Sequence, residues 1–410
     1  MRTILHCDLN NFFASVECKV NPDLKKYPVA VCGSVEDRRG IVLAKNDIAK
    51  ATGVSTGEPI WQAKQKCRNL VIVPPHFNLY EEYSRKTYEI YTRFTDNIEA
   101  FGIDECWLDV TGSARLFGNG KDIAFKIKET IKSELGLCIS VGVSFNKIFA
   151  KLGSDMKKPD AITVISYENF KNKIWELPCS DLIGIGRSTN ARLKKYSINT
   201  IGELANTSPD FLKRNFGICG VYLWRYANGL DDSPVHHQSY CREIKSVGNS
   251  TTCPYNLASN DDVWRVMYRL SQNVCERMRA NNLSANGVQI SIKTPDMHMT
   301  EYQMHVYSPV RSSLYLCKAG FELFKNNYEW ETDVRAIGIR AINLSDSRAE
   351  KQLNFLDDNR KIENAEKLEE VSDTLKTRFG KGIIFPLSLK KDIYMEYQPN
   401  FIKNNTPNVD

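Results

Sequence analysis

Three carboxylates stand where two strands are expected to end. Asp8 closes the apolar stretch at the amino terminus, and Asp104 and Glu105 form the turn between the two apolar runs of residues 98–109. Three carboxylates that converge at a sheet edge can bind two divalent ions about 3.5–4 Å apart, the arrangement that serves phosphoryl transfer. Hard oxygen ligands favour Mg²⁺. The pattern therefore predicts a site for two Mg²⁺ ions, and a solvated acidic turn is the plain alternative.

The elements that must position these carboxylates follow from the hydrophobic pattern. Residues 2–8 predict a strand, and residues 98–109 predict a β-hairpin around the acidic turn. Isoleucine and leucine recur every fourth residue over 123–135, which is typical of one face of an amphipathic helix. Residues 137–143 then predict another strand. The first 165 residues are therefore expected to form an α/β unit whose helices pack on a sheet.

The rest of the chain changes character after residue 166. Residues 167–233 are predicted to be helical with glycine-rich breaks, and the polar segment after them is predicted to be a linker. A small α+β domain of about a hundred residues is expected next. Its predicted elements are, in order, a strand, a helix at 261–281, a strand at 286–293, a further strand, a helix at 309–325 and a strand at 334–343. One more amphipathic helix is predicted at 361–377.

Composition narrows the class of protein. The chain has 410 residues, of which 42% are hydrophobic, so several folded domains are expected. No stretch of about eighteen apolar residues occurs, so we expect no membrane span and a cytoplasmic protein. The 12 cysteines include no Cys-x-x-Cys pair, which argues against a zinc site. A net charge of +6 permits a nucleic-acid partner without demanding one.

Four segments occur in the order and spacing of a known family. They read DLNNFFASVE at 8–17, GIDECWLD at 102–109, VGVSFNKIFAKLGSDMKKP at 141–159 and KSVGNSTT at 245–252. Together they resemble the Y family of translesion DNA polymerases, in the bacterial branch of polymerase IV and UmuC-like enzymes. The resemblance extends over roughly residues 1–350.

The resemblance implies an α+β multidomain fold, a right hand with palm, fingers, thumb and little finger. Assigned by similarity, the domains are a palm at 1–10 and 77–166, fingers at 11–76, a thumb at 167–233, a linker at 234–240, a little finger at 241–350 and a tail at 351–410.

The family's catalytic residues transfer to individual positions of this sequence. Asp8, Asp104 and Glu105 would be the catalytic metal ligands, and the Leu9 carbonyl would also contact a metal. Phe13 falls on the steric-gate position, where an aromatic ring excludes a 2′-hydroxyl. Without the resemblance, Phe13 would be interpreted as an ordinary core aromatic.

The triphosphate is expected to meet a further set of side chains. Phe12 would lie near the sugar and triphosphate, and Lys158 falls on a triphosphate-binding lysine; a solvated surface lysine is its alternative. Lys50 stands where the family often has an arginine, and it can still neutralise phosphate. Asp47 stands where a tyrosine is frequent and Gly102 where a serine is common, so the nucleotide contacts are expected to differ in detail.

A helix-hairpin-helix is predicted in the thumb. Gly184 and Gly186 let the backbone approach a DNA phosphate, and the helix that follows points its N–H groups at it. Arg187 and Lys194 add positive charge; a plain turn between helices is the alternative. Lys245 opens the segment that resembles the start of the DNA-binding little finger. Residues 241–350 nevertheless hold 13 Lys and Arg against 12 Asp and Glu, which is a near balance of charge.

A short peptide after the little finger resembles the one by which bacterial polymerases bind the sliding clamp. Its expected anchors are Gln352, Leu353 and Phe355, and a stray apolar linker segment is the alternative.

These features predict a monomeric, template-directed DNA polymerase of low fidelity. It would add deoxynucleoside triphosphates to primer–template DNA by two-metal phosphoryl transfer during translesion synthesis and DNA damage tolerance. No proofreading is expected. A nucleotide cyclase remains an alternative, because such enzymes also use a palm-like sheet and two metals, and a non-catalytic DNA-binding scaffold is a second alternative.

Overall fold

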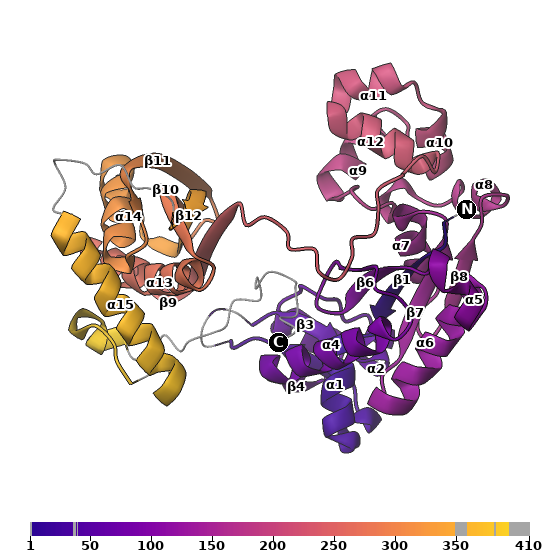
Figure 1. Cartoon of the computed structure of the whole chain (residues 1–410), viewed down its shortest axis with the longest axis horizontal. Helices are drawn as coiled ribbons and strands as arrows, with labels where there is room; N and C mark the ends of the chain where they lie inside the picture. Colours follow the sequence, from indigo (N-terminus) through magenta and orange to yellow (C-terminus); the bar gives the residue numbers. More distant parts are fainter. Residues whose placement is uncertain (1, 36–37, 39, 349–358, 381–382, 393–410) are drawn as a thin grey trace. The chain divides into compact units, whose positions relative to one another are not determined.

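A computed structural model describes residues 2–35, 38, 40–348, 359–380 and 383–392 (Figure 1). The chain divides into two compact units. The first contains Met1–Gly33 and Ile41–Cys241, and the second contains Ser34–Gly40 and the described part of Arg242–Asn404. No helix among the described residues is long and apolar enough to cross a membrane.

A five-stranded sheet lies at the centre of the first unit, in the order β5-β6-β1-β7-β8. The central strand β1 pairs antiparallel with both β6 and β7, and β8 runs parallel to β7. The strands are β1 (Ile4–Leu9), β5 (Ile98–Ala100), β6 (Glu105–Asp109), β7 (Ile139–Ser144) and β8 (Ile162–Ile165). All six residues of β1 are buried, because helices cover both faces of this strand.

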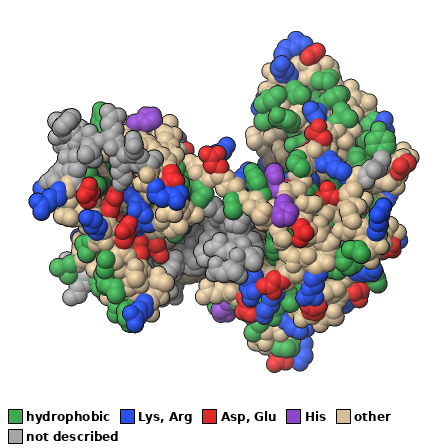
Figure 2. Space-filling model, in the orientation of Figure 1, with side chains coloured by type: hydrophobic (Ala, Val, Ile, Leu, Met, Phe, Trp, Pro, Cys, Tyr) green, Lys and Arg blue, Asp and Glu red, His purple; other side chains and the backbone are tan. Residues whose placement is uncertain are grey.

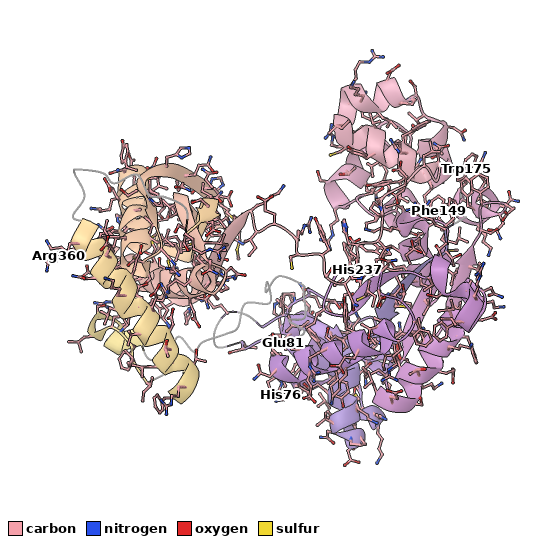
Figure 3. All side chains as sticks on the ribbon, viewed as in Figure 1. His76, Glu81, Phe149, Trp175, His237 and Arg360 are labelled. Atoms are coloured by element: carbon pink, nitrogen blue, oxygen red, sulfur yellow. The ribbon has the colours of Figure 1, made fainter. Side chains whose placement is uncertain are left out.

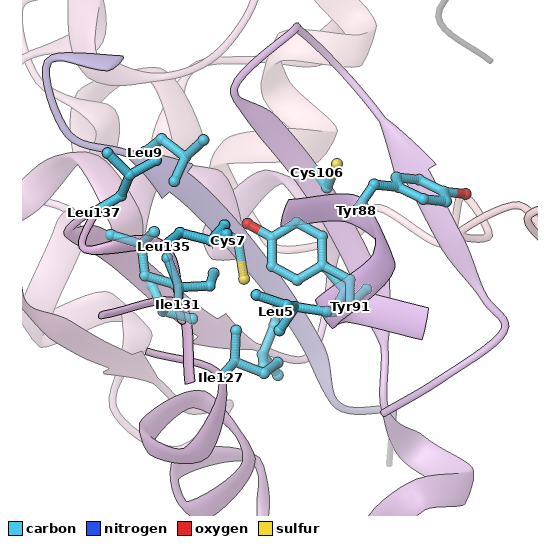
Figure 4. Packing of buried hydrophobic residues seen from close by; sticks show 14 of the residues in the cluster. Leu5, Cys7, Leu9, Tyr88, Tyr91, Cys106, Ile127, Ile131, Leu135 and Leu137 are labelled. Atoms are coloured by element: carbon cyan, nitrogen blue, oxygen red, sulfur yellow. The ribbon is translucent and has the colours of Figure 1, made fainter. Parts of the chain in front are cut away.

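Side chains alternate across β1 and divide it between two helical layers. Leu5, Cys7 and Leu9 enter a core with α4 (Phe77–Thr92) and α6 (Gly120–Leu135), as Figure 4 shows. The alternate residues Ile4, His6 and Asp8 face α7 (Lys147–Met156) instead: Ile4 packs with Ala150, and the other two make polar contacts to α7. One face of the strand is therefore apolar, and the other face carries the polar side chains of His6 and Asp8 toward the end of the strand.

The helix α6 confirms the prediction made from its isoleucine spacing. Ile123, Ile127 and Ile131 are fully buried in the core. Asn119 and Asp122 form a capping box at its start, and Gly136 ends it in the left-handed conformation with φ 66°. The predicted hairpin at 98–109 is likewise confirmed as β5 and β6 around the acidic turn.

Two smaller groups of elements complete the first unit. The first group is a three-stranded sheet in the order β3-β2-β4 with the helices around it. Its elements are α1 (Phe12–Val20), η1 (Pro22–Lys26), β2 (Val29–Cys32), β3 (Val42–Lys45), α2 (Asp47–Ala51), α3 (Ile60–Lys66) and β4 (Val71–Val73). Short helices follow at η2 (Thr111–Ser113), α5 (Ala114–Phe117), α8 (Phe170–Ile174), η3 (Cys179–Asp181), α9 (Arg187–Lys195), α10 (Ile201–Asn206), α11 (Pro209–Phe216) and α12 (Ile218–Ala227).

The segment predicted as a linker has no helix or strand, but polar contacts attach it to the five-stranded sheet. The backbone N–H of Gln238 donates to the carbonyl of Asp96 at 2.8 Å, and that of His236 donates to Glu99 at 3.2 Å. The buried side chain of Lys147 donates to the same Glu99 carboxylate at 2.7 Å. The composition of the segment did not indicate this attachment.

The second unit is a four-stranded antiparallel sheet in the order β11-β10-β12-β9 with helices packed on it. Its elements are β9 (Ser246–Leu257), α13 (Asn260–Ala280), β10 (Leu283–Lys293), β11 (Met299–Val310), α14 (Ser313–Asn327), β12 (Val334–Asp346), α15 (Asn359–Phe379) and η4 (Leu387–Asp392). The predicted α+β order is confirmed, although α14 begins at Ser313 because residues 309–310 still belong to β11.

Candidate active site

The structure brings two of the three predicted carboxylates, Asp8 and Glu105, together at one end of β1. Asp8 lies directly opposite Glu105 in the register of β1 and β6. An oxygen of each carboxylate and a ring nitrogen of His6 all lie within 4.8 Å of one another. Asp104 precedes Glu105, and its backbone carbonyl accepts a 3.0 Å hydrogen bond from the N–H of Leu9. Strand pairing thus converts two distant sequence segments into one acidic cluster.

His6 connects this cluster to helix α7. Its side chain is fully buried, and its Nδ1 lies 2.8 Å from the hydroxyl of Ser154. Its Nε2 lies 3.3 Å from Oε2 of Glu105. Burial lowers the pKa of His6 despite the neighbouring Glu105, so the ring is neutral at pH 7. The contact with Ser154 thus holds the His6 ring at Nδ1, and its Nε2 faces the Glu105 carboxylate.

Helix α7 also directs positive charge at the carboxylates. The ammonium group of Lys151 lies 2.7 Å from Glu105 and 3.3 Å from Asp8, and that of Lys158 lies 2.8 Å from Asp8. Asp155 pairs with both lysines, at 3.1 and 2.9 Å. The acidic cluster is therefore faced by Lys151 of α7 and by Lys158 just after this helix, and Asp155 of α7 pairs with both lysines.

The acidic groups respond differently to this environment. Burial, and then the charges of Glu105 and Asp8, raise the pKa of Asp104 to about 7. Burial also acts to raise the pKa of Glu105, but hydrogen bonds from His6 and Lys151 outweigh it and lower that pKa to about 2. The neighbouring carboxylates favour the neutral form of Asp104, and a divalent cation bound there would instead stabilise its ionised form. The donor set of clustered carboxylate oxygens fits hard divalent ions.

Gly102 leaves room for the Asp104 side chain. A Cβ atom at residue 102 would lie 3.3 Å from Oδ1 of Asp104, which is a tight contact. Glycine at residue 102 therefore leaves the Asp104 carboxylate without this close contact.

The two adjacent phenylalanines of α1 occupy different environments. Phe12 is 3% exposed and belongs to the main core, whereas Phe13 is half-buried and packs on the edge of that core. The ring of Phe13 stacks on Tyr80 of α4, with centroids 4.2 Å apart and planes 11° apart. Phe13 is thus the more accessible ring of the pair.

The side chain of Asp47 on α2 holds the turn before α1. Asn11 has a left-handed backbone with φ 51°, and its side-chain amide donates to Asp47 at 2.8 Å. Lys50 is an exposed residue of the same helix α2. Burial, and then the charge of Lys50, lower the pKa of Lys45 on β3. Asp47 therefore anchors a turn, while Lys50 of α2 lies near enough to Lys45 of β3 to interact electrostatically with it.

The predicted helix-hairpin-helix has the expected backbone. Gly184 adopts φ 91°, in the region that favours glycine, and Gly186 is the N-cap residue of α9. Arg187 begins α9 and Lys194 lies in its last turn, and both are exposed. The nearby Arg192 instead stacks its guanidinium 4.7 Å from the ring centroid of Phe216.

Charge on the rest of the molecule is mixed. Figure 2 shows Lys and Arg side chains interspersed with Asp and Glu on the face that it draws. In the second unit, Lys245 is exposed directly before β9, and Arg340 is exposed on β12. The peptide of Gln352, Leu353 and Phe355 lies outside the described residues.

The sequence patterns did not single out His6, Lys151 or Asp155. Two signals were present: His6 is two residues before Asp8, which puts both on one face of a strand, and Lys151, Asp155 and Lys158 follow helical spacing. That the helix packs on the polar face of β1 was not readable from either pattern.

Comparisons with known proteins cover most of the chain. Residues 7–155 match the model of the impB/mucB/samB family, residues 244–355 match the C-terminal domain of that family, and residues 180–231 match the DNA polymerase-iota thumb domain. The chain is 49% identical to DNA polymerase IV of Acetivibrio thermocellus, over 92% of this chain and 95% of the relative. It is 35% identical to DNA polymerase IV 1 of Halalkalibacterium halodurans, over 93% and 92%. Among solved structures, the Y-family DNA polymerase chimera Dbh-Dpo4(243-245)-Dbh matches with a TM-score of 0.75 and 26% identity, over 83% of this chain and 98% of the chimera.

Proposed function

The chain belongs to the Y family of DNA polymerases, and on that premise we propose that Asp8, Asp104 and Glu105 form its metal-dependent catalytic centre. As a member of this family it has the right-hand fold and is a DNA-directed DNA polymerase of low fidelity that acts in translesion synthesis. The observation that carries the site assignment is the register of β1 and β6, which places Asp8 opposite Glu105. Neither a nucleotide cyclase nor a non-catalytic scaffold agrees with this family.

The enzyme uses divalent metal ions, and we assign two Mg²⁺ ions to the three carboxylates and the Leu9 carbonyl. When bound, such ions lower the pKa of the primer 3′-hydroxyl and hold the leaving pyrophosphate. The chain's own residues prepare this centre: His6 and Lys151 hold the Glu105 carboxylate, and Gly102 leaves the space that Asp104 needs.

Two lysines, Lys158 just after α7 and Lys50 on α2, are assigned to the triphosphate. Lys158, which contacts Asp8 at 2.8 Å, stands at the edge of the acidic cluster, where an incoming triphosphate would approach. Its point charge suits phosphate oxygens. Lys50 on α2 adds an exposed charge, and the carboxylate of its neighbour Asp47 accepts a hydrogen bond from Asn11.

The sugar is assigned to the aromatic side of the site. Phe13 is the steric gate, because its ring is half-buried and lies on the helix that follows Asp8. Phe12 sits in the core and positions the backbone beneath the sugar and triphosphate.

DNA contacts are assigned to both units. The N–H groups at the start of α9, with Gly184, Gly186, Arg187 and Lys194, would hold phosphates of the duplex. Lys245 would serve the same purpose beside β9. The domain boundaries given above, a monomeric state, a cytoplasmic location and binding of the bacterial sliding clamp complete the proposal.

Single-nucleotide primer extension tests the catalytic centre. Asp104→Ala and Glu105→Ala should abolish incorporation while primer–template binding stays near that of the wild type. Asp109→Asn is the matched control, because Asp109 lies on the same strand at the end away from the cluster. Extension by a folded Asp104→Ala protein within about tenfold of wild type would exclude the assignment.

A further inference from the structure

Phe13 rests on a side chain that is itself held in place. Tyr80 is fully buried beneath the half-buried Phe13 ring, and the two rings are nearly parallel at 4.2 Å. Phe77 meets both rings edge-on, with centroids 6.2 Å from Phe13 and 6.0 Å from Tyr80. Tyr80 is therefore the surface against which the Phe13 ring would be pressed by a sugar.

The hydroxyl of Tyr80 is anchored by a buried carboxylate. It donates a hydrogen bond to Oε1 of Glu17, whose exposed fraction is 5%. The Nδ1 of His76 lies 2.8 Å from the same oxygen. Burial, and then the hydrogen bond to Glu17, raise the pKa of Tyr80, so the phenol keeps its proton and remains the donor.

Side-chain contacts connect α1 and α4 at two places. Phe13 and Glu17 are four residues apart on α1, so they lie on one face of that helix. His76 and Tyr80 are four residues apart at the start of α4, where Figure 3 shows His76 at the helix end. The ring stack is one connection between α1 and α4, and the carboxylate with its two donors is the second.

We infer that Glu17 and Tyr80 are positioning residues that fix the Phe13 ring and thereby set how strongly the enzyme discriminates against ribonucleotides. The inference rests on the proposed role of Phe13 as the gate. Stacked rings slide over one another at small cost, whereas selection by a steric clash depends on where the ring lies to a fraction of an ångström. The anchored hydroxyl removes this freedom, because it fixes the far end of the Tyr80 ring.

The central variant is Tyr80→Phe, which keeps the stack and removes only the anchor. The ratio of kcat/KM for a deoxynucleotide to that for the matched ribonucleotide should fall about three- to tenfold, the effect of one hydrogen bond. Glu17→Leu should lower the ratio similarly. Glu17→Gln, which retains an acceptor oxygen at the same place, should restore most of it. Tyr88→Phe, on the same helix and in the same core, is the control that should leave the ratio unchanged.

Combining the variants separates positioning from simple destabilisation. In the background of Phe13→Ala, adding Tyr80→Phe should not change the ratio further, because the anchor acts only through the gate ring. A lower melting temperature for Tyr80→Phe with an unchanged ratio would mean a purely structural role and would overturn the inference. So would an equal loss of kcat/KM for both sugars.

The reference variant Phe13→Ala distinguishes the two possible failures. If it relaxes the ratio but Tyr80→Phe does not, the gate assignment stands and the positioning inference is wrong. If Phe13→Ala leaves the ratio unchanged, the gate assignment itself is wrong, and the inference falls with it.

Discussion

The ammonium nitrogen of Lys158 lies 2.8 Å from Oδ2 of Asp8, although 150 residues separate them in the chain. Asp8 ends strand β1, whereas Lys158 follows helix α7, and packing of that helix on the sheet brings the two together. A carboxylate assigned to a metal and a cation assigned to a triphosphate are thus direct neighbours. This pair is the basis of the first prediction.

Lys158→Ala should weaken nucleotide binding. Loss of one charge-assisted hydrogen bond to a phosphate should lower kcat/KM for deoxynucleotides about 10- to 100-fold, mainly through KM. Lys157→Ala is the control, because Lys157 is the exposed neighbour of Lys158 and carries the same charge without the contact to Asp8. Steady-state kinetics with varied nucleotide concentration measure both. An unchanged KM for Lys158→Ala would remove this lysine from the triphosphate site.

Phe13→Ala or Phe13→Val should raise ribonucleotide incorporation steeply, with a smaller effect on deoxynucleotides. The expected change is near a hundredfold in relative kcat/KM, which corresponds to about 3 kcal/mol of discrimination. Phe12→Ala is the matched control: its ring is in the core, so both sugars should suffer. The measurement is single-nucleotide kinetics with matched substrates on one primer–template. If Phe12→Ala alone relaxes the ratio, the gate is one residue earlier than assigned.

Arg187→Ala and Lys194→Ala should weaken DNA binding uniformly across sequences. The slope of log K against log salt concentration should fall by about one unit for each lost phosphate contact. Arg192→Ala on the same helix is the control, because its guanidinium packs on Phe216 and should affect stability more than the slope. Binding titrations over a range of salt concentrations give the slopes. Equal slopes for wild type and Arg187→Ala would show that α9 does not contact the DNA backbone.

Replacing Gln352, Leu353 and Phe355 by alanine should remove stimulation by the bacterial sliding clamp and leave distributive synthesis unchanged. Docking of a short extended peptide depends on a few anchoring side chains. Asn354→Ala, inside the same peptide but between the anchors, should keep the stimulation. Primer extension with and without the clamp measures it. Stimulation that survives the triple replacement would place the clamp contact elsewhere.

Arg279→Ala should destabilise the second unit and loosen α15. The side chain of Arg279 is 7% exposed and pairs with Glu369 at 2.5 Å and Asp373 at 2.7 Å. Removing it leaves two acidic groups in a partly buried site, which costs about 3–5 kcal/mol. Arg348→Ala, which breaks an exposed pair with Asp346, should change stability little. Denaturant unfolding and proteolysis within α15 report the difference; equal effects of the two variants would contradict it.

Much of the scaffold was determined by local sequence alone. The four-residue spacing of Ile123, Ile127 and Ile131 specifies α6, because a strand would bury the charged Glu129 on the same face as these isoleucines. The two apolar runs around Asp104 and Glu105 specify the hairpin, because an acidic pair fits a solvent-facing turn. These patterns are short-range, so they can be read without knowing what the element packs against.

The contacts that complete the site were decided only by the tertiary structure. His6, Lys151 and Asp155 reach the carboxylates because α7 packs on the polar face of β1, and no periodicity states which helix covers which face. Glu17 and Tyr80 are 63 residues apart, and their hydrogen bond exists because α1 and α4 lie side by side. The sequence alone therefore determined the local elements, the main carboxylates and the resemblance to the family. Long-range packing determined which side chains hold the carboxylates and the Phe13 ring. The free energy of burial decides which surfaces pack together, and these surfaces come from segments that are far apart in the sequence.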